Sequence, residues 1–206
     1  MNAVAKVQVV KHYLDAGPLF CLGSSEVLAD LFDVHWLGES NVVAAVVSEI
    51  GRNADLVLPA VGPNDKRDLK KSARVVRGRY KTLLASAKQV PTPEPEALSV
   101  MNDELCERDQ DETGVSGNAH PRKNDGEVES VYWAIADSAQ LVSNDKHAHY
   151  LACKYGVISL NFVEVTRRLI GGQKLVSRRA AYKEIVGLAR RKIYPGEHVA
   201  GVLDLA

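Results

Sequence analysis

Short apolar runs of strand length alternate along the chain with longer segments in which apolar residues recur at helical spacing. Residues 15–18 predict a turn at the exit of the first apolar run. The apolar runs predict strands at 7–14, 34–37, 141–143 and 157–160. This alternation is typical of a parallel sheet covered by helices on both faces, so we expect an α/β fold.

Helices are predicted between these strands. In 40–54, the residues Val43, Val46 and Ile50 form an apolar stripe at 3.6-residue spacing. Segment 108–124 is polar and contains glycine, and it predicts a loop. A long basic helix is expected at 64–88, with any break near its start. The other helices are expected at 26–32, 96–107, 127–139, 146–155, 162–170 and 177–192.

The length of 206 residues suits one α/β domain with additions. We expect this domain over 7–170, with a helical and loop insertion at about 60–124 and a basic helical extension over 171–206. No apolar run approaches the roughly 20 residues that span a bilayer, and no secretory signal is visible. The three cysteines lack CxxC spacing. A cytoplasmic protein without membrane contact, disulfide framework or structural zinc is therefore expected.

The net charge of zero is the sum of separated blocks of opposite sign. Residues 65–88 hold nine Lys or Arg against two Asp, and 167–192 hold nine against one Glu. Residues 94–129 hold eleven Asp or Glu against three Lys or Arg. The two basic segments could follow a phosphate backbone, and the acidic residues of 104–112 could fold over a basic groove.

Four acidic residues occupy positions that the predicted fold would bring to one place. Asp15 and Asp145 directly follow apolar runs, Glu49 lies on the helix at 40–54, and Glu127 begins the helix at 127–139. Carboxylates gathered in this way repel one another unless a hard divalent cation joins them, and Mg²⁺ or Mn²⁺ accepts oxygen ligands. Carboxylate-bound metal suits the cleavage of phosphodiester bonds.

Each acid also has a structural interpretation. Asp15 could cap a helix or form a turn ahead of Pro18, and Asp145 could be the N-cap of the helix at 146–155. Glu49 could be a solvated helix residue, and Glu127 an ordinary acid of a first helical turn, where the helix dipole favours its ionised form.

Four short motifs carry a resemblance to a known family. The chain contains YLDAGPL at 13–19, VVSEI at 46–50, DGEVESV at 125–131 and LVSND at 141–145. In order and spacing these resemble the four motifs of PIN-domain nucleases, which include the VapC-type toxins. Counting back from Asp145 selects Glu127 as the third acid rather than its neighbours Asp125 and Glu129.

The resemblance implies a metal-dependent endoribonuclease on a three-layer α/β/α fold with a central parallel sheet. Mg²⁺ or Mn²⁺ would be held by Asp15, Glu49, Glu127 and Asp145, which would also be the catalytic residues. Ser143 and Asn144 could hydrogen-bond these carboxylates or the substrate. The RNA backbone would be held by basic residues, for which the candidates are Arg74, Arg77, Arg79, Lys81, Arg178 and Arg179.

The family further suggests a VapC-like toxin with a cognate antitoxin, and a homodimer. One alternative is a non-catalytic PIN-like module that binds RNA or protein, and another is a structure-directed DNA nuclease on the same scaffold. His147 and His149 lie two residues apart on a predicted helix and are expected to be surface residues that make a poor metal pair.

Overall fold

A four-stranded parallel sheet forms the centre of the protein, which confirms the predicted α/β class. The computed structural model describes residues 10–58, 64–92, 94–113, 124–171 and 175–190. The strands lie in the order β2-β1-β3-β4, and they are β1 (His12–Leu14), β2 (Ser40–Asn41), β3 (Gln140–Val142) and β4 (Ser159–Leu160). All pairs are parallel. Because the chain passes from β1 to β2 on one side and returns to β3 on the other, the sheet has a switch point between β1 and β3.

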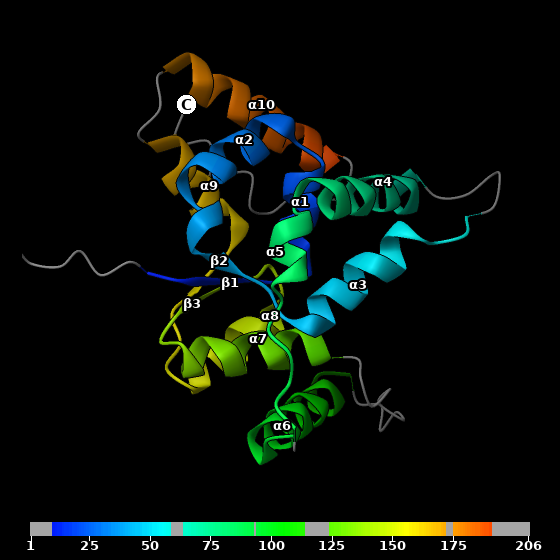
Figure 1. Ribbon diagram of the computed structural model, residues 1–206, viewed down its shortest axis with the longest axis vertical. Helices are drawn as coiled ribbons and strands as arrows, with labels where there is room; N and C mark the ends of the chain where they lie inside the picture. Colours follow the sequence, from blue (N-terminus) through cyan, green and yellow to red (C-terminus); the bar gives the residue numbers. More distant parts are fainter. Residues whose placement is uncertain (1–9, 59–63, 93, 114–123, 172–174, 191–206) are drawn as a thin grey trace, which may run out of the picture.

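Helices cover both faces of this sheet in a three-layer α/β/α arrangement (Figure 1). The helices α7 and α8 lie on one side, and α1, α2 and α9 lie on the other. The helical elements are α1 (Ala16–Gly23), α2 (Glu26–His35), the 3-10 helix η1 (Leu37–Glu39), α3 (Ala44–Ala54), α4 (Asn64–Arg79), α5 (Lys81–Ala85), α6 (Glu96–Thr113), α7 (Asp125–Ala136), α8 (Lys146–Lys154), α9 (Phe162–Gly171) and α10 (Leu175–Arg190).

The turn predicted at 15–18 is instead the start of α1. Asp15 is the N-cap, and its carboxylate accepts a hydrogen bond from the backbone of Ala16. Pro18 fits the first turn of α1 because the N–H groups there have no partner within the helix, so its missing donor costs nothing. The strand predicted at 34–37 was also wrong, since α2 and η1 cover most of it and the paired strand β2 comes later.

Several predicted helices have other bounds in the structure; the helix predicted at 40–54 begins only at Ala44, because Ser40–Asn41 form β2. The basic segment 64–88 forms two helices, α4 and α5, and the break falls at Tyr80 rather than near the start. The predicted loop at 108–124 is helical as far as Thr113, because α6 continues through its acidic end. The rest of that predicted loop, 114–123, lies outside the described residues.

Buried apolar side chains form two clusters. The larger cluster joins β1 to the helices from α1 to α4 and to α9, and it includes Ala181, Ile185 and Leu188 of α10. The basic segment that follows the predicted domain therefore packs its apolar face against α2 and α9. The smaller cluster joins α6, α7 and α8. None of the helices in the described ranges has the length and apolarity that crossing a bilayer requires.

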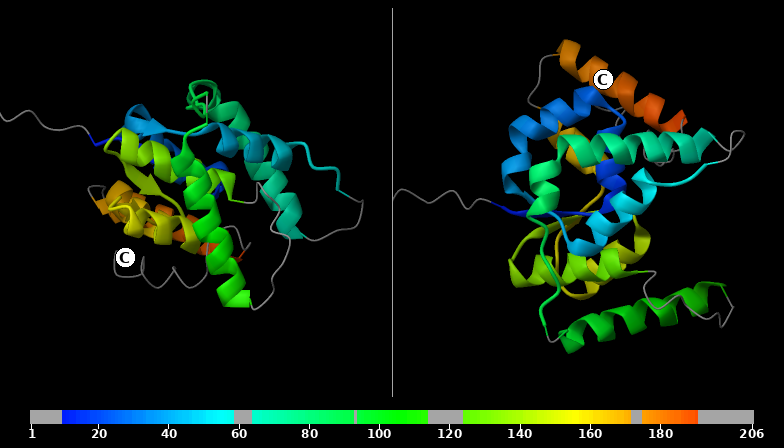
Figure 2. Two further views of the ribbon diagram at one scale, coloured as in Figure 1. Left: turned by 90° about the horizontal axis from the view of Figure 1, so that it is seen from below. Right: turned by 45° about the vertical axis from the view of Figure 1, so that its right-hand side comes forward.

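The acidic helix α6 lies against α7 and α8, on the far side of those helices from α4 and α10 (Figures 1 and 2). Leu98, Met101 and Leu105 bury its apolar side. Glu104 forms an ion pair with Lys154 at 2.8 Å and accepts a hydrogen bond from the Tyr155 hydroxyl. The idea that this segment folds over a basic groove was therefore wrong for its described residues.

Helices α1 and α4 approach closely at Gly23. The Ser72 hydroxyl of α4 donates a hydrogen bond to the Phe20 carbonyl oxygen of α1. A Cβ atom added at Gly23 would lie 2.5 Å from the Ser72 carbonyl oxygen and 2.7 Å from Val76 Cγ2. Only glycine allows this approach, which places α4 directly against α1, the helix that follows β1.

Replacing Gly23 by alanine tests this packing. We expect Gly23→Ala to lower the free energy of unfolding by about 1–3 kcal/mol in chemical denaturation, because backbone atoms of α4 must retreat. Gly78→Ala on α4 is the matched control, since the added Cβ would meet no atom within 4 Å among the described residues. The higher helix propensity of alanine should make this control more stable by about 0.5–1 kcal/mol. Equal effects of the two substitutions would contradict the close packing.

Candidate functional site

A cavity of about 330 Å³ opens at the carboxyl ends of β1 and β3. Asp15, which follows β1, and Asp145, which begins α8 after β3, both line it. Glu49 reaches it from α3, and Glu127 reaches it from α7. The structure therefore brings the four predicted acids together. We call this the acidic cavity; its other lining residues are Ala16, Gly17, Phe20, Leu69 and Asn144.

Asp15 is held at the switch point of the sheet by several hydrogen bonds. Its backbone N–H donates to the Val142 carbonyl oxygen at 2.9 Å, which ties the end of β1 to the end of β3. Its Oδ1 accepts from the Ala16 N–H at 2.7 Å, and its Oδ2 accepts from the Ser143 hydroxyl at 2.7 Å. Asp15 is only 7% exposed, so its carboxyl group has a fixed position.

Asp145 is the N-cap of α8. Its Oδ1 accepts from the His147 N–H at 2.6 Å and from the Ala148 N–H at 3.4 Å. The Asp145 N–H in turn donates to the Ser143 hydroxyl oxygen at 3.0 Å. Capping is thus a real role of both aspartates, and both carboxyl groups still line the cavity.

The structure separates Glu127 from its two rivals. Glu129 Oε2 accepts a hydrogen bond from the Ala45 N–H at 3.1 Å and so stabilises the start of α3. Asp125 and Glu129 line an adjoining cavity of about 210 Å³, which shares Glu49 and Glu127 with the acidic cavity. Of the three acids in this stretch, Glu127 is the one that shares a cavity with Asp15.

Burial and nearby negative charge raise the pKa values of Asp15, Glu49 and Glu127. Burial, followed by the charges of Asp15 and Asp145, raises the pKa of Glu127 to about 8. Burial and the charge of Asp15 likewise raise the pKa of Glu49 to about 7. Burial also raises the pKa of Asp15, against the lowering effect of the Ser143 hydrogen bond. A backbone hydrogen bond at the helix start lowers the pKa of Glu127, as expected, but burial and the charge of Asp15 outweigh it.

Asn144 has a structural partner at the edge of the cavity. Its Oδ1 accepts from the Phe162 N–H at 2.9 Å and so fixes the start of α9. Its amide group thereby connects the loop after β3 to α9. Ser143, by contrast, is fully buried and bonds to the carboxylate of Asp15 itself.

Two basic residues lie near the carboxyl groups: Arg52, which was not singled out from the sequence, and His149, which was expected only to be a surface residue. The charge of His149 lowers the pKa of Asp15 against the effect of burial, and the Nδ1 of His149 lies 2.8 Å from the Ser159 hydroxyl. Arg52 lines the adjoining cavity and opposes the raised pKa of Glu49. Helical spacing could have indicated that both lie near these acids, because His149 follows Asp145 by four residues and Arg52 follows Glu49 by three.

The histidines of α8 are more buried than expected. His147 is only 8% exposed, and His149 is partly buried. The prediction as a surface residue was therefore wrong for His147. The helix positions them on different faces, with His149 on the side of Asp15 and Ser159.

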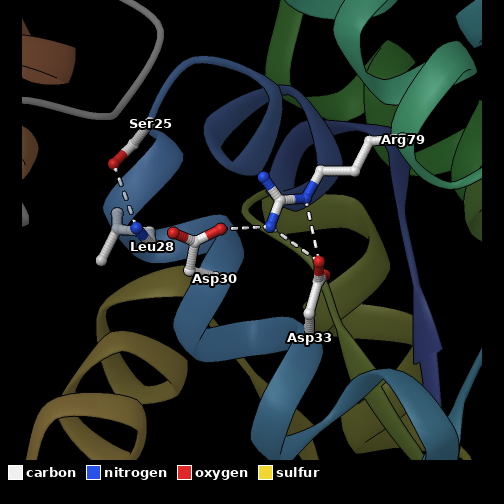
Figure 3. Close-up of polar contacts among 5 residues, drawn as sticks. All are labelled: Ser25, Leu28, Asp30, Asp33 and Arg79. Carbon is white, nitrogen blue, oxygen red and sulfur yellow. Dashed lines mark hydrogen bonds and ion pairs between the residues drawn. The ribbon is translucent and has the colours of Figure 1, made fainter.

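Some of the predicted RNA-binding residues are paired with acidic side chains, and others are exposed. Arg77 donates to both carboxylate oxygens of Asp55 at 2.9 Å. Arg79 bridges Asp30 and Asp33 of α2, where Ser25 caps the helix through the Leu28 N–H (Figure 3). These acids balance the charges of Arg77 and Arg79. Arg74, Lys81 and Arg179 are exposed, and the side chain of Arg178 lies outside what the structure describes.

No family model, curated protein or solved structure matches the chain. Within the described residues, no three His, Cys, Asp or Glu side chains already stand in an arrangement that could hold a metal ion. The donor set of the acidic cavity nevertheless fits a hard cation, because all four groups are carboxylates, whose oxygens are the ligands that such a cation prefers.

The charge of Glu127 predicts how the metal-free protein responds to pH. The folded state keeps a proton on Glu127 up to a pKa of about 8, whereas the unfolded chain releases it near the ordinary value of 4.5. The proton on Glu127 therefore stabilises the fold fully below the pKa of the unfolded chain. This stabilisation is lost as the pH rises through the pKa of the folded protein. Glutamine resembles the protonated acid, so Glu127→Gln should be the more stable protein at pH 8.

Thermal unfolding in EDTA measures this effect. We expect Glu127→Gln to exceed the wild-type Tm by at least roughly 2–4 °C at pH 8, which corresponds to about 1 kcal/mol in a chain of this size. The two proteins should converge at pH 5. Glu107→Gln, which alters an exposed acid of α6, is the control and should show no such gap. A lower Tm for Glu127→Gln at pH 8 would show that Glu127 stabilises the fold as a charged group.

Proposed function

We propose that the protein is a metal-dependent endoribonuclease that hydrolyses RNA phosphodiester bonds at the acidic cavity. The observation that carries this proposal is the meeting of Asp15, Glu49, Glu127 and Asp145 in one cavity at the switch point of a parallel sheet. In open α/β sheets, ligands bind outside the carboxyl ends of the strands at such a point.

Mg²⁺ or Mn²⁺ is the cofactor that suits this set of oxygen donors. When bound, it would supply a water nucleophile of lowered pKa and offset charge on the leaving oxygen. Asp15 offers a carboxylate whose position is fixed by Ser143 and by the start of α1. Asp145 uses Oδ1 for both of its capping bonds, which leaves Oδ2 for a ligand. Glu49 and Glu127 would give up their protons when a cation takes their place.

Arg52 would complete the site from the neighbouring cavity. It is exposed, and it lines the same space as Glu49 and Glu127. A guanidinium group there can hold a phosphate oxygen in a bidentate manner next to the carboxylates. The motifs at 13–19, 46–50, 125–131 and 141–145 support a nuclease of the PIN type, and a toxin role with an antitoxin and a homodimer remain predictions of that resemblance.

Asparagine substitutions separate capping from metal binding. Asparagine caps helices about as well as aspartate, so Asp15→Asn and Asp145→Asn should keep the fold while removing a charged ligand. We expect purified wild type to cleave a mixed RNA pool with Mn²⁺ or Mg²⁺ and not with EDTA. Each variant should lose at least about 100-fold in rate, while Glu107→Gln on α6 should cleave as wild type does.

Circular dichroism and thermal unfolding should accompany the cleavage assay. Folded variants that cleave as fast as the wild type would contradict the carboxylate site. Wild type that binds RNA equally with and without metal and cleaves nothing would indicate the non-catalytic binding module. Preferential cleavage of a branched DNA over every RNA would indicate the DNA nuclease.

A further inference from the structure

A second concave surface, of about 530 Å³, lies on α4 beside the segment that follows α3. Four basic side chains and two apolar ones line it, and no Asp or Glu does so in the described part of the chain. We call it the basic cavity; its lining residues are Leu58, Arg67, Lys70, Lys71, Arg74 and Val75. Like charges gathered around one hollow repel one another, and a bound polyanion would relieve that repulsion.

Backbone carbonyl groups hold two of these cations in place. Lys70 Nζ donates to the Leu56 carbonyl oxygen at 2.5 Å, and Arg74 Nε donates to the Ala54 carbonyl oxygen at 3.1 Å. Carbonyl groups position a cation without neutralising its charge. The other two cations, Arg67 and Lys71, are exposed at the surface of α4.

The distribution of acids along α4 leaves this part of the helix positive. The arginines nearer its end, Arg77 and Arg79, are paired with Asp55, Asp30 and Asp33. By contrast, residues 56–63, which precede α4, contain no acidic residue in the sequence. Within α4 itself, residues 64–75 hold five Lys or Arg against Asp65 and Asp68, and neither of these acids lines the basic cavity, so this part of the helix keeps a net positive charge.

One helix joins the basic cavity to the acidic cavity. Leu69 of α4 lines the acidic cavity, while its sequence neighbours Arg67 and Lys70 line the basic one. A helix with its side chains is about 10–12 Å wide. A strand whose scissile phosphate lies at the carboxylates could therefore pass around α4 and place a phosphate several nucleotides away at the basic cavity.

We propose that the basic cavity binds the phosphate backbone of single-stranded RNA, outside the acidic cavity, and holds nucleotides that flank the cleaved bond. This inference rests on the proposed nuclease function for the choice of RNA. Lysine and arginine contacts of this kind provide affinity without base specificity. The apolar surfaces of Leu58 and Val75 suit the ribose and base faces that accompany the phosphates.

RNA binding by the full chain in EDTA tests the proposal apart from cleavage. Fluorescence anisotropy with a labelled single-stranded RNA would compare the wild type with Arg67→Gln/Lys71→Gln, which spares the carbonyl contacts of Lys70 and Arg74. The matched control is Lys66→Gln/Lys183→Gln, since both lysines are exposed, on α4 and α10, and neither lines the cavity. Both double variants remove two positive charges.

We expect the Arg67→Gln/Lys71→Gln variant to raise the Kd for RNA at least about tenfold at 0.1 M salt, and the control to change it less than about twofold. The slope of log Kd against log salt concentration should fall by about 1.4 in the cavity variant, since each lost phosphate contact of a single strand contributes roughly 0.7. Thermal unfolding should show that both variants are folded.

Three results would overturn the proposal. One is equal weakening by both double variants, which would indicate a diffuse charge effect. The second is unchanged affinity in both. The third is binding of a poly-glutamate peptide as tightly as RNA, with equal loss in the cavity variant, which would identify an acidic protein partner. A wild type that binds RNA at the cavity and cleaves nothing would refute the nuclease function alone.

Discussion

The hydroxyl group of Ser143 is the contact on which the rest of the site depends. It donates to the Asp15 carboxylate and accepts from the Asp145 N–H, so it joins the acid after β1 to the acid after β3. Ser143 is completely buried, and a buried hydroxyl with both partners in place gives a fixed geometry. Its own N–H donates to the Leu160 carbonyl oxygen of β4. One residue therefore connects three strands at the edge where the carboxyl groups meet.

The acidic cavity is costly for the metal-free protein, and the fold tolerates this cost through protonation. Burial and the nearby charges of Asp15 and Asp145 raise the pKa values of Glu49 and Glu127. Both side chains therefore keep their protons to a higher pH than an exposed glutamate does. A site that served only structure would gain stability from neutral side chains in the same places. The proposed cation would remove this cost, because its charge would offset the negative charge of the four carboxylates.

Local sequence signals predicted the parts of the site that depend on local structure. Asp145 follows an apolar run, and a parallel sheet gathers such strand ends at one edge. The α1 helix was missed because a proline such as Pro18 normally indicates a turn. Pro18 is compatible with the helix only because Asp15 caps it, which places the proline in the first turn. Motif spacing selected Glu127 over Glu129, but the role of Glu129 in holding the start of α3 is a long-range contact that no local pattern predicts. The pairing of Arg79 with α2 is also long-range, so no local pattern could reveal that its charge is balanced.

Capping and metal binding are compatible roles for the aspartates of this site. A carboxylate has about four lone-pair positions on its two oxygens, and the capping bonds of Asp145 use one oxygen only. The cap also has a consequence for chemistry, because it fixes the direction in which the remaining oxygen points. A ligand on a flexible loop would lose conformational entropy on binding a cation, whereas a capping aspartate has already lost it on folding. The N-cap interpretation of Asp15 and Asp145 is therefore part of the explanation of how they could serve as ligands.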